Sequence, residues 1–241
     1  MDLRGIVLAG GTGSRLMPLT KVTNKHLLPV GRRPMIFYPI EKLTAIGIEE
    51  ILIVTGVEHM GDVVSLLGSG KNFGCRFTYK VQDEAGGIAQ ALALAENFAN
   101  SHPLAVILGD NIFRANLKSF ADKFIAQQAG ARILLKQVPY PQRFGVAELS
   151  EDRIIGIEEK PEQPKSDYAV TGIYFYDAAV FDIIKTLKPS GRGEFEITHV
   201  NDAYIAKQQL AYDILDGWWT DAGTFESLTR ANELVAKEPP L

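Results

Sequence analysis

The alternation of short apolar runs with longer amphipathic stretches constrains the fold of this chain more than any other feature of its sequence. The apolar runs of the first half lie at residues 5–9, 51–56, 77–81 and 104–110. The amphipathic stretches lie at residues 35–47, 62–67, 88–99 and 117–128. Strands covered on both faces are apolar along their length, and helices packed on a sheet carry one apolar stripe. The alternation therefore predicts a Rossmann-like, three-layer α/β/α fold with a mostly parallel central sheet.

The pattern changes after Leu134, where predicted strands follow one another with little helix between them. These strands lie at residues 132–138, 145–149, 153–159 and 168–177. Two helices at 178–187 and 197–207, a strand at 210–215 and a terminal helix at 224–236 complete the prediction. Closely spaced strands are typical of antiparallel pairs. We therefore expect one domain over residues 1–241, with an antiparallel, ligand-side insertion at about 139–189.

The charge balance argues against some classes of partner. The 241 residues include 25 basic and 29 acidic side chains, a net charge of −4, and like charges form no block. Surfaces that bind nucleic acids or anionic membranes need basic clusters, so neither partner is expected. The chain has one cysteine, Cys75, and no apolar run of signal-peptide or membrane-spanning length. We therefore expect a reducing, cytoplasmic location.

A glycine-rich loop follows the first predicted strand, and residues 5–30 read GIVLAGGTGSRLMPLTKVTNKHLLPV. Glycine lets backbone N–H groups approach a phosphate, and three occur here, at Gly10, Gly11 and Gly13. Two common phosphate motifs fail. Leu16 stands where the dinucleotide fingerprint needs its third glycine, and the lysine of a P-loop is missing from its position.

Two basic side chains distinguish this loop from a plain turn. Arg15 can fork onto phosphate oxygens, and Lys25 supplies a compact, movable positive charge. Pro18 and Pro29 restrict the backbone that carries them. We interpret the loop as a phosphate site; the alternative is a strand-ending turn with two solvated bases.

Two aspartates follow apolar stretches, Asp110 in LGDN and Asp221 in WWTDAGT. Carboxylates are natural ligands of Mg²⁺, which binds through one or two of them and through substrate phosphates. More than a hundred residues separate the two, so periodicity alone cannot pair them. A helix cap or Asx turn is the alternative for each.

Further polar motifs end two other predicted strands. Gln82 carries an amide that can donate to and accept from a pyrimidine edge, and at Gly87 a base could approach the backbone closely. A turn at the start of a helix is the simpler interpretation of these residues alone. Glu159 and Lys160 lie in IEEKP, where a carboxylate could accept sugar hydroxyls and the lysine could meet a phosphate. Adjacent strand residues point to opposite faces, so a bend is needed for both to reach one ligand. An exposed charged hairpin is the alternative.

In this order, the motifs resemble those of the sugar-phosphate nucleotidylyltransferases, and among them the short form that transfers thymidylyl to glucose 1-phosphate. The resemblance covers essentially the whole chain. Beyond the glycine loop it is carried by VQDEAGGIAQAL, VILGDN, RFGVAE, IEEKPEQPKSDYAVTGIYFYD, PSGRGEFEIT and WWTDAGT. At His199 that family has an acidic residue after its EIT motif, so we expect the contact there to differ.

The resemblance implies a reaction of dTTP with α-D-glucose 1-phosphate that gives dTDP-glucose and pyrophosphate, with Mg²⁺ as cofactor, in a homodimer or homotetramer. It implies that Arg15 and Lys25 are catalytic and that Asp110 and Asp221 hold the metal. The residues implied for the nucleotide are Gly10, Gly11, Gly13, Arg15, Gln82, Gly87 and Asp110. Those implied for the sugar phosphate are Asn111, Gly145, Glu159, Lys160, Val170 and Arg192.

Three alternatives to this reaction follow. The same chemistry could use uracil in place of thymine, or another sugar 1-phosphate, because discrimination over one small group can be modest. A non-catalytic nucleotide-sugar sensor would be expected to lack Arg15, Lys25 or an aspartate, and all are present. An NAD-dependent dehydrogenase is excluded mainly by Leu16.

Overall fold

The structure is a computed structural model that describes residues 2–240. Within these residues a nine-stranded sheet has the order β10-β9-β11-β6-β1-β4-β5, with β8 on β11 and β12 on β8. Its strands are β1 Arg4–Ala9, β4 Glu50–Gly56, β5 Arg76–Gln82, β6 Leu104–Leu108, β8 Ala131–Gln137, β9 Gly145–Ser150, β10 Arg153–Glu159, β11 Tyr168–Tyr176 and β12 Leu210–Ile214. Two small sheets pair β2 Pro29–Val30 with β3 Arg33–Pro34, and β7 Asn111–Phe113 with β13 Trp219–Asp221. The helices are α1 Phe37–Thr44, α2 Met60–Leu67, α3 Ile88–Ala93, α4 Glu96–Ala99, α5 Lys118–Gln127, α6 Val180–Thr186, α7 Ile197–Ala206 and α8 Phe225–Lys237.

Helices cover both faces of the central sheet, and β1 shows why residues 6–9 are all apolar. Val7 and Ala9 join the core cluster under α1, α2 and α5, whereas Ile6 and Leu8 join the cluster under α3, α4, α6 and α7. Successive side chains of a strand point to opposite faces, so a strand buried on both sides needs an apolar residue at every position. The predicted three-layer α/β fold is confirmed.

The parallel part of the sheet creates a ligand-binding edge. The chain runs outward from β1 to β4 and β5 and then returns to β6 on the other side of β1, with all four strands parallel. Ligands bind beyond the carboxyl ends of strands at such a reversal of order. Gly10 directly follows β1, Gln82 ends β5, and Asp110 lies two residues after β6. Three sequence-predicted site residues therefore meet at one edge.

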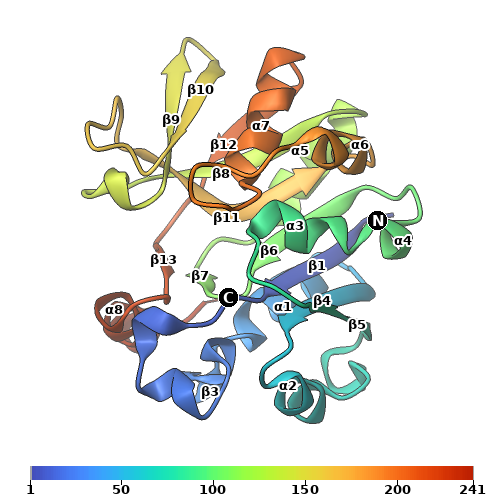
Figure 1. Cartoon of the computed structure of the whole chain (residues 1–241), viewed down its shortest axis with the longest axis vertical. Helices are drawn as coiled ribbons and strands as arrows, with labels where there is room; N and C mark the ends of the chain where they lie inside the picture. Colours follow the sequence, from blue (N-terminus) through green and yellow to red (C-terminus); the bar gives the residue numbers. More distant parts are fainter. Residues whose placement is uncertain (1, 241) are drawn as a thin grey trace.

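The second half adds antiparallel strands, as expected. β9 and β10 form a hairpin, which projects at the top of Figure 1, whereas α2 lies at the bottom. The long strand β11 runs antiparallel to β6 and to β8 and also touches β9. The segment 139–189 thus contains both a projecting hairpin and a strand of the central sheet. β12 pairs with β8 in parallel.

The structure differs from the sequence prediction at short elements. The stretch 88–99 forms two helices, α3 and α4, because the chain turns at residues 94–95. β6 ends at Leu108, so Asp110 lies outside the strand. The two- and three-residue strands β2, β3, β7 and β13 were not predicted. No helix within residues 2–240 is both long and apolar enough to cross a membrane.

Candidate functional site

A cavity of ≈ 290 Å³, here called the glycine-loop cavity, opens beyond the ends of β1, β5 and β6. Its lining residues are Leu8, Gly10, Gly11, Arg15, Lys25, His26, Gln82, Ala85, Gly87, Ile88, Ala91, Leu108, Asp110 and Glu194. The loop needs glycine at position 11, where φ is +92°, and at Gly13, where φ is +63° at the start of the 3₁₀ turn Ser14–Leu16. That turn brings Arg15 to the cavity wall.

Lys25 and Asp110 form an ion pair in this cavity. Lys25 Nζ lies 2.6 Å from Asp110 Oδ2, and both side chains are largely buried. Burial alone would raise the pKa of Asp110, but the charge and hydrogen bond of Lys25 hold it below its ordinary value. The cavity therefore carries a fixed carboxylate and an ammonium group that is already close to it.

The 3₁₀ turn Lys25–Leu27 holds Lys25 in place. Asn24 caps this turn: its Oδ1 accepts a hydrogen bond from the backbone N–H of His26 at 2.9 Å and lies 2.7 Å from His26 Nδ1. Burial, together with the charge of Lys25, lowers the pKa of His26 to about 3. His26 is therefore a neutral, buried support for Lys25 at neutral pH.

Gln82 lies against the glycine loop. A Cβ on Gly10 would come within 2.6 Å of Gln82 Oε1, so the absence of a side chain at Gly10 makes room for the amide. Gln82 Nε2 donates to the backbone oxygen of Gly87 at 3.2 Å and to Gln90 Oε1 at 2.7 Å. The amide is thus held at the cavity wall with its oxygen next to Gly10.

A second hollow of ≈ 170 Å³, here called the Glu159 cavity, adjoins the first and shares Arg15, Ile88, Leu108 and Asp110 with it. Its other lining residues are Asn111, Arg143, Phe144, Gly145, Glu159, Lys160, Val170, Gly172, Tyr174, Ile197, Thr198, Trp219 and Asp221. Two molecules bound in the two cavities would therefore meet at Arg15 and Asp110.

The chain bends after Glu159, as is needed for two adjacent side chains to reach one ligand. Glu159 ends β10, and Lys160 adopts a left-handed conformation with φ +47°. Both side chains consequently line one cavity. Thr198 Oγ1 donates to Glu159 Oε2 at 2.9 Å, which orients the carboxylate.

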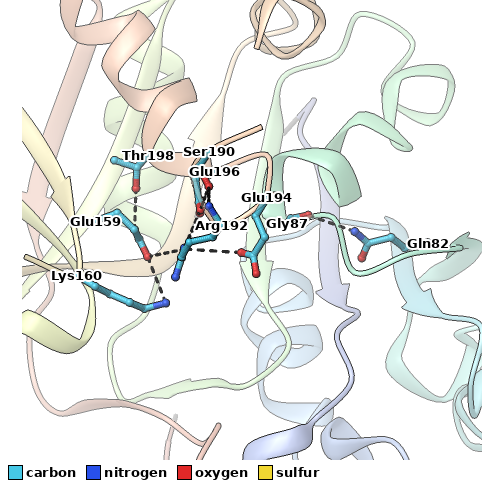
Figure 2. Close-up of polar contacts among 9 residues, drawn as sticks. All are labelled: Gln82, Gly87, Glu159, Lys160, Ser190, Arg192, Glu194, Glu196 and Thr198. Carbon is cyan, nitrogen blue, oxygen red and sulfur yellow. Dashed lines mark hydrogen bonds and ion pairs between the residues drawn. The ribbon is translucent and has the colours of Figure 1, made fainter. Parts of the chain in front are cut away.

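Arg192 lies in a cluster of acidic side chains. Its Nη2 is 2.8 Å from Glu196 Oε1, 3.5 Å from Glu159 Oε1 and 3.7 Å from Glu194 Oε2. Figure 2 shows the guanidinium among these carboxylates, on the Glu159 side of the site. Arg192 is not among the residues that line either cavity. In this conformation Arg192 forms ion pairs with acidic side chains, whereas the resemblance implies that it binds the sugar phosphate.

Strand pairing joins the two aspartates that the sequence could not pair. Asp221 of β13 stands opposite Asn111 of β7, and the backbone N–H of Ala222 donates to the backbone oxygen of Asp110 at 2.9 Å. Asn111 Nδ2 donates to Asp110 Oδ1 at 3.1 Å, while its Oδ1 accepts from Gly172 N and Trp219 Nε1. Asn111 therefore supports Asp110 as well as lining the Glu159 cavity.

Asp110 and Asp221 fit a divalent cation. A Cβ built on Gly223 would lie 3.1 Å from Arg15 Nη2 and 3.4 Å from Oδ2 of each aspartate, so the three side chains converge. Burial and the negative charge of Asp110 raise the pKa of Asp221. A cation between the two carboxylates would relieve their mutual repulsion. Within residues 2–240 no group of three or more metal-binding side chains occurs. Two carboxylates suit Mg²⁺, which completes its shell with substrate phosphates and water.

Several side chains of this site were not predicted from the sequence. Arg143 lines the Glu159 cavity, and its charge opposes the rise in the pKa of Asp221. Glu194 lines the glycine-loop cavity, and Thr198 orients Glu159. All three lie within motifs that carry the resemblance, RFGVAE and PSGRGEFEIT, so position in a motif was the available signal. Gly145 and Val170 line the Glu159 cavity.

Comparisons with known proteins agree with this geometry. Residues 4–238 match the family described as nucleotidyl transferase. Glucose-1-phosphate thymidylyltransferase of Neisseria meningitidis serogroup A / serotype 4A is 45% identical over 97% of this chain and 82% of its own length. The enzyme of the same name from Mycolicibacterium smegmatis is 41% identical over 97% and 82%.

Solved structures give the same result. A Bacillus anthracis protein crystallised with a sucrose, and provisionally named glucose-1-phosphate thymidylyltransferase, has a TM-score of 0.93 and 59% identity over 96% of this chain and 94% of its own. A UDP-glucose pyrophosphorylase in complex with UDP-glucose has a TM-score of 0.86 and 26% identity over 99% and 100%. The motifs, the adjoining cavities and these similarities together show that the chain belongs to the nucleotidyl transferase family.

Proposed function

We propose that this protein transfers the thymidylyl group of dTTP to α-D-glucose 1-phosphate and releases pyrophosphate, leaving dTDP-glucose. The observation that carries the proposal is the pair of adjoining cavities, which meet at Arg15 and Asp110. The glycine-loop cavity would take the nucleotide and the Glu159 cavity the sugar phosphate. The relatives named glucose-1-phosphate thymidylyltransferase support this choice of substrates.

The proposed reaction is a single in-line displacement. A phosphate oxygen of glucose 1-phosphate bonds to the α-phosphorus of dTTP, the bond from that phosphorus to the oxygen that bridges the α- and β-phosphates breaks, and this oxygen leaves as a terminal oxygen of pyrophosphate. No side chain becomes covalently attached, so catalysis rests on positioning and on stabilising charge. Arg15 would contact the triphosphate, and Glu159 with Lys160 would orient the sugar phosphate.

Lys25 would neutralise charge at the α-phosphate. Its ammonium group already lies beside Asp110, where the two cavities meet. Mg²⁺ held by Asp110 and Asp221 would supply further positive charge to the phosphate oxygens. With the Asp110 carboxylate on one side and the phosphates on the other, Lys25 would contact both without leaving the cavity.

A pyrophosphate-release assay tests the proposal. The protein is incubated with Mg²⁺, glucose 1-phosphate and each of dTTP, UTP, dCTP, ATP and GTP. We expect dTTP to give the highest kcat/KM. Lys25→Ala should lower kcat on the order of 10²-fold, as for other lost electrostatic contacts. Lys21→Ala, which removes an exposed lysine four positions away, is the matched control.

A uridylyltransferase is the second candidate, because the chain is also similar in structure to a UDP-glucose pyrophosphorylase. A higher kcat/KM with UTP than with dTTP would favour it. Nucleotide binding without pyrophosphate release from any mixture would reject both enzymes and leave a nucleotide-sugar-binding protein. We also propose a homodimer or homotetramer, which light scattering would test.

A further inference from the structure

Two glutamine side chains and two backbone groups form a chain of hydrogen bonds at the wall of the glycine-loop cavity. The backbone N–H of Gly86 donates to Gln90 Oε1 at 3.1 Å, and Gln82 Nε2 donates to the same oxygen at 2.7 Å. Gln82 Nε2 also donates to the oxygen of Gly87 at 3.2 Å, as Figure 2 shows. Gln82 lines the cavity, whereas Gln90 is not among its lining residues.

The two backbone groups determine which way both amides face. A backbone N–H can only donate, so the Gln90 atom beside Gly86 must be the oxygen. A backbone carbonyl can only accept, so the Gln82 atom beside Gly87 must be the nitrogen. The Gln82 oxygen is then left beside Gly10, on the wall of the glycine-loop cavity.

Gly86 makes this arrangement possible. A Cβ at Gly86 would overlap the side-chain amide of Gln90. The pair of glycines in DEAGGIAQAL therefore has two separate roles: Gly86 admits Gln90, and Gly87 accepts from Gln82.

We propose that Gln90 is a positioning residue for base selection, because it holds the Gln82 amide with its oxygen toward the cavity. An acceptor at this point pairs with the N3–H of thymine or uracil. Cytosine presents an unprotonated N3, which would face the Gln82 oxygen without a hydrogen. A site built to accept from an N–H rejects an analogue that lacks it. This inference rests on the proposed function in so far as it takes the cavity to be the nucleotide site.

The test measures binding rather than turnover. Isothermal titration calorimetry gives the Kd of dTTP and of dCTP, with Mg²⁺ and without sugar phosphate, for the full chain and two variants. Gln90→Met keeps the length and helix propensity of the side chain but replaces the amide oxygen with a weakly accepting sulfur, so that the longer bond to the Gly87 oxygen alone holds Gln82 Nε2. Gln90→Glu keeps an acceptor. We expect Gln90→Met to reduce the preference for dTTP over dCTP about fivefold to tenfold, roughly the contribution of one hydrogen bond. Gln90→Glu should retain the preference.

A general loss of structure would weaken the binding of both nucleotides equally, so the ratio of the two Kd values distinguishes a positioning role from an effect on stability. Wild-type protein that binds dCTP as tightly as dTTP overturns the inference, whether or not pyrophosphate is released. An unchanged ratio in Gln90→Met, or an equal loss in Gln90→Glu, overturns it as well. If Gln90→Met does not fold, Gly86→Ala replaces it, since the new Cβ displaces Gln90.

Discussion

At Gly223 one missing methyl group lets three side chains converge. A Cβ there would lie 3.1 Å from Arg15 Nη2 and 3.4 Å from the nearer oxygens of Asp110 and Asp221. Arg15 can move aside because the contact is at the end of a flexible side chain, so the fold should tolerate the methyl group. The added methyl group would, however, contact Oδ2 of both carboxylates.

We therefore predict that Gly223→Ala raises the Mg²⁺ concentration needed for half-maximal pyrophosphate release at least about tenfold, the effect of roughly 1.4 kcal/mol. A Mg²⁺ titration of turnover measures this. Gly156→Ala is the control, because a Cβ at Gly156 meets no atom within 4 Å. A wild-type titration curve for Gly223→Ala would argue against a metal between the two aspartates.

His26 should make the stability of the fold depend on pH. Its pKa falls from 6.5 to about 3 on folding, because burial and Lys25 oppose protonation. Below pH 6.5 the unfolded chain therefore binds a proton that the folded protein does not, and the free energy of unfolding falls. At pH 5 the loss is about 2 kcal/mol and it grows toward pH 3. Asp110, with its lowered pKa, contributes stability that is lost only below its ordinary value of 3.8.

Urea unfolding at pH 7.5 and pH 5 measures the difference. His26→Gln should remove most of this pH dependence, since glutamine does not titrate. His102→Gln, at a partly exposed histidine that pairs with Asp2, is the control for the loss of one histidine. An equal slope in His26→Gln and wild type would contradict the assignment to His26.

At the scale of elements, the segment before α7 is tied to the start of α3. The backbone N–H of Phe195 donates to the Gly86 oxygen at 2.7 Å, and that of Ala89 donates to the Phe195 oxygen at 3.0 Å. Gly87 lies between these bonds with φ +101°, and a Cβ there would come within 2.5 Å of the Phe195 oxygen. The contact links the glycine-loop cavity to the segment that carries Arg192.

Gly87→Ala should break this contact. Strained backbone and the overlap together should lower the free energy of unfolding by about 2–4 kcal/mol, and both substrates should bind more weakly. Gly61→Ala is the matched control, because Gly61 lies in α2 with open space around it and should gain up to about 1 kcal/mol. Urea unfolding and the KM of each substrate measure the two effects. A higher KM for dTTP with an unchanged KM for glucose 1-phosphate would show that the contact between Gly87 and Phe195 does not affect the Glu159 cavity.

The long elements could be predicted from the sequence because their periodicity repeats over many residues. β1, β4 and β5 and helices such as α8 were predicted close to their observed bounds. The strands β7 and β13 have three residues each and form because they pair with each other across the site. Nothing local in the sequence marks such a pair.

The same distinction applies to the site. Gly10, Gln82 and Asp110 could be predicted to lie at one edge of the sheet, because each lies at or just beyond the end of a parallel strand. The convergence of Asp221 with Asp110 depends on the β7–β13 pair, and the role of Gln90 depends on hydrogen bonds between side chains. The acidic neighbours of Arg192 likewise follow from the path of a loop. Contacts of these kinds come from tertiary structure and have no periodic signature.

At the scale of the whole molecule, β11 joins the two halves of the sheet. It pairs with β6 of the first half and with β8 and β9 of the second. Neither half of the sheet can therefore unfold without breaking the hydrogen bonds between β6 and β11. The site likewise takes residues from Leu8 to Asp221. Folding and ligand binding should therefore involve residues 2–240 as one unit.

We predict a single thermal transition with the same Tm by far-UV circular dichroism and by fluorescence of the two tryptophans, Trp218 and Trp219. The first signal reports all helices and strands, and the second reports the chain at β13. With Mg²⁺, dTTP at about 100 times its Kd should add about 2.7 kcal/mol and raise both Tm values together by about 5–10 °C. A nucleotide that shifted the circular dichroism transition but not the tryptophan transition would mean that the two halves unfold separately. The site between them would then have to form from two independent units.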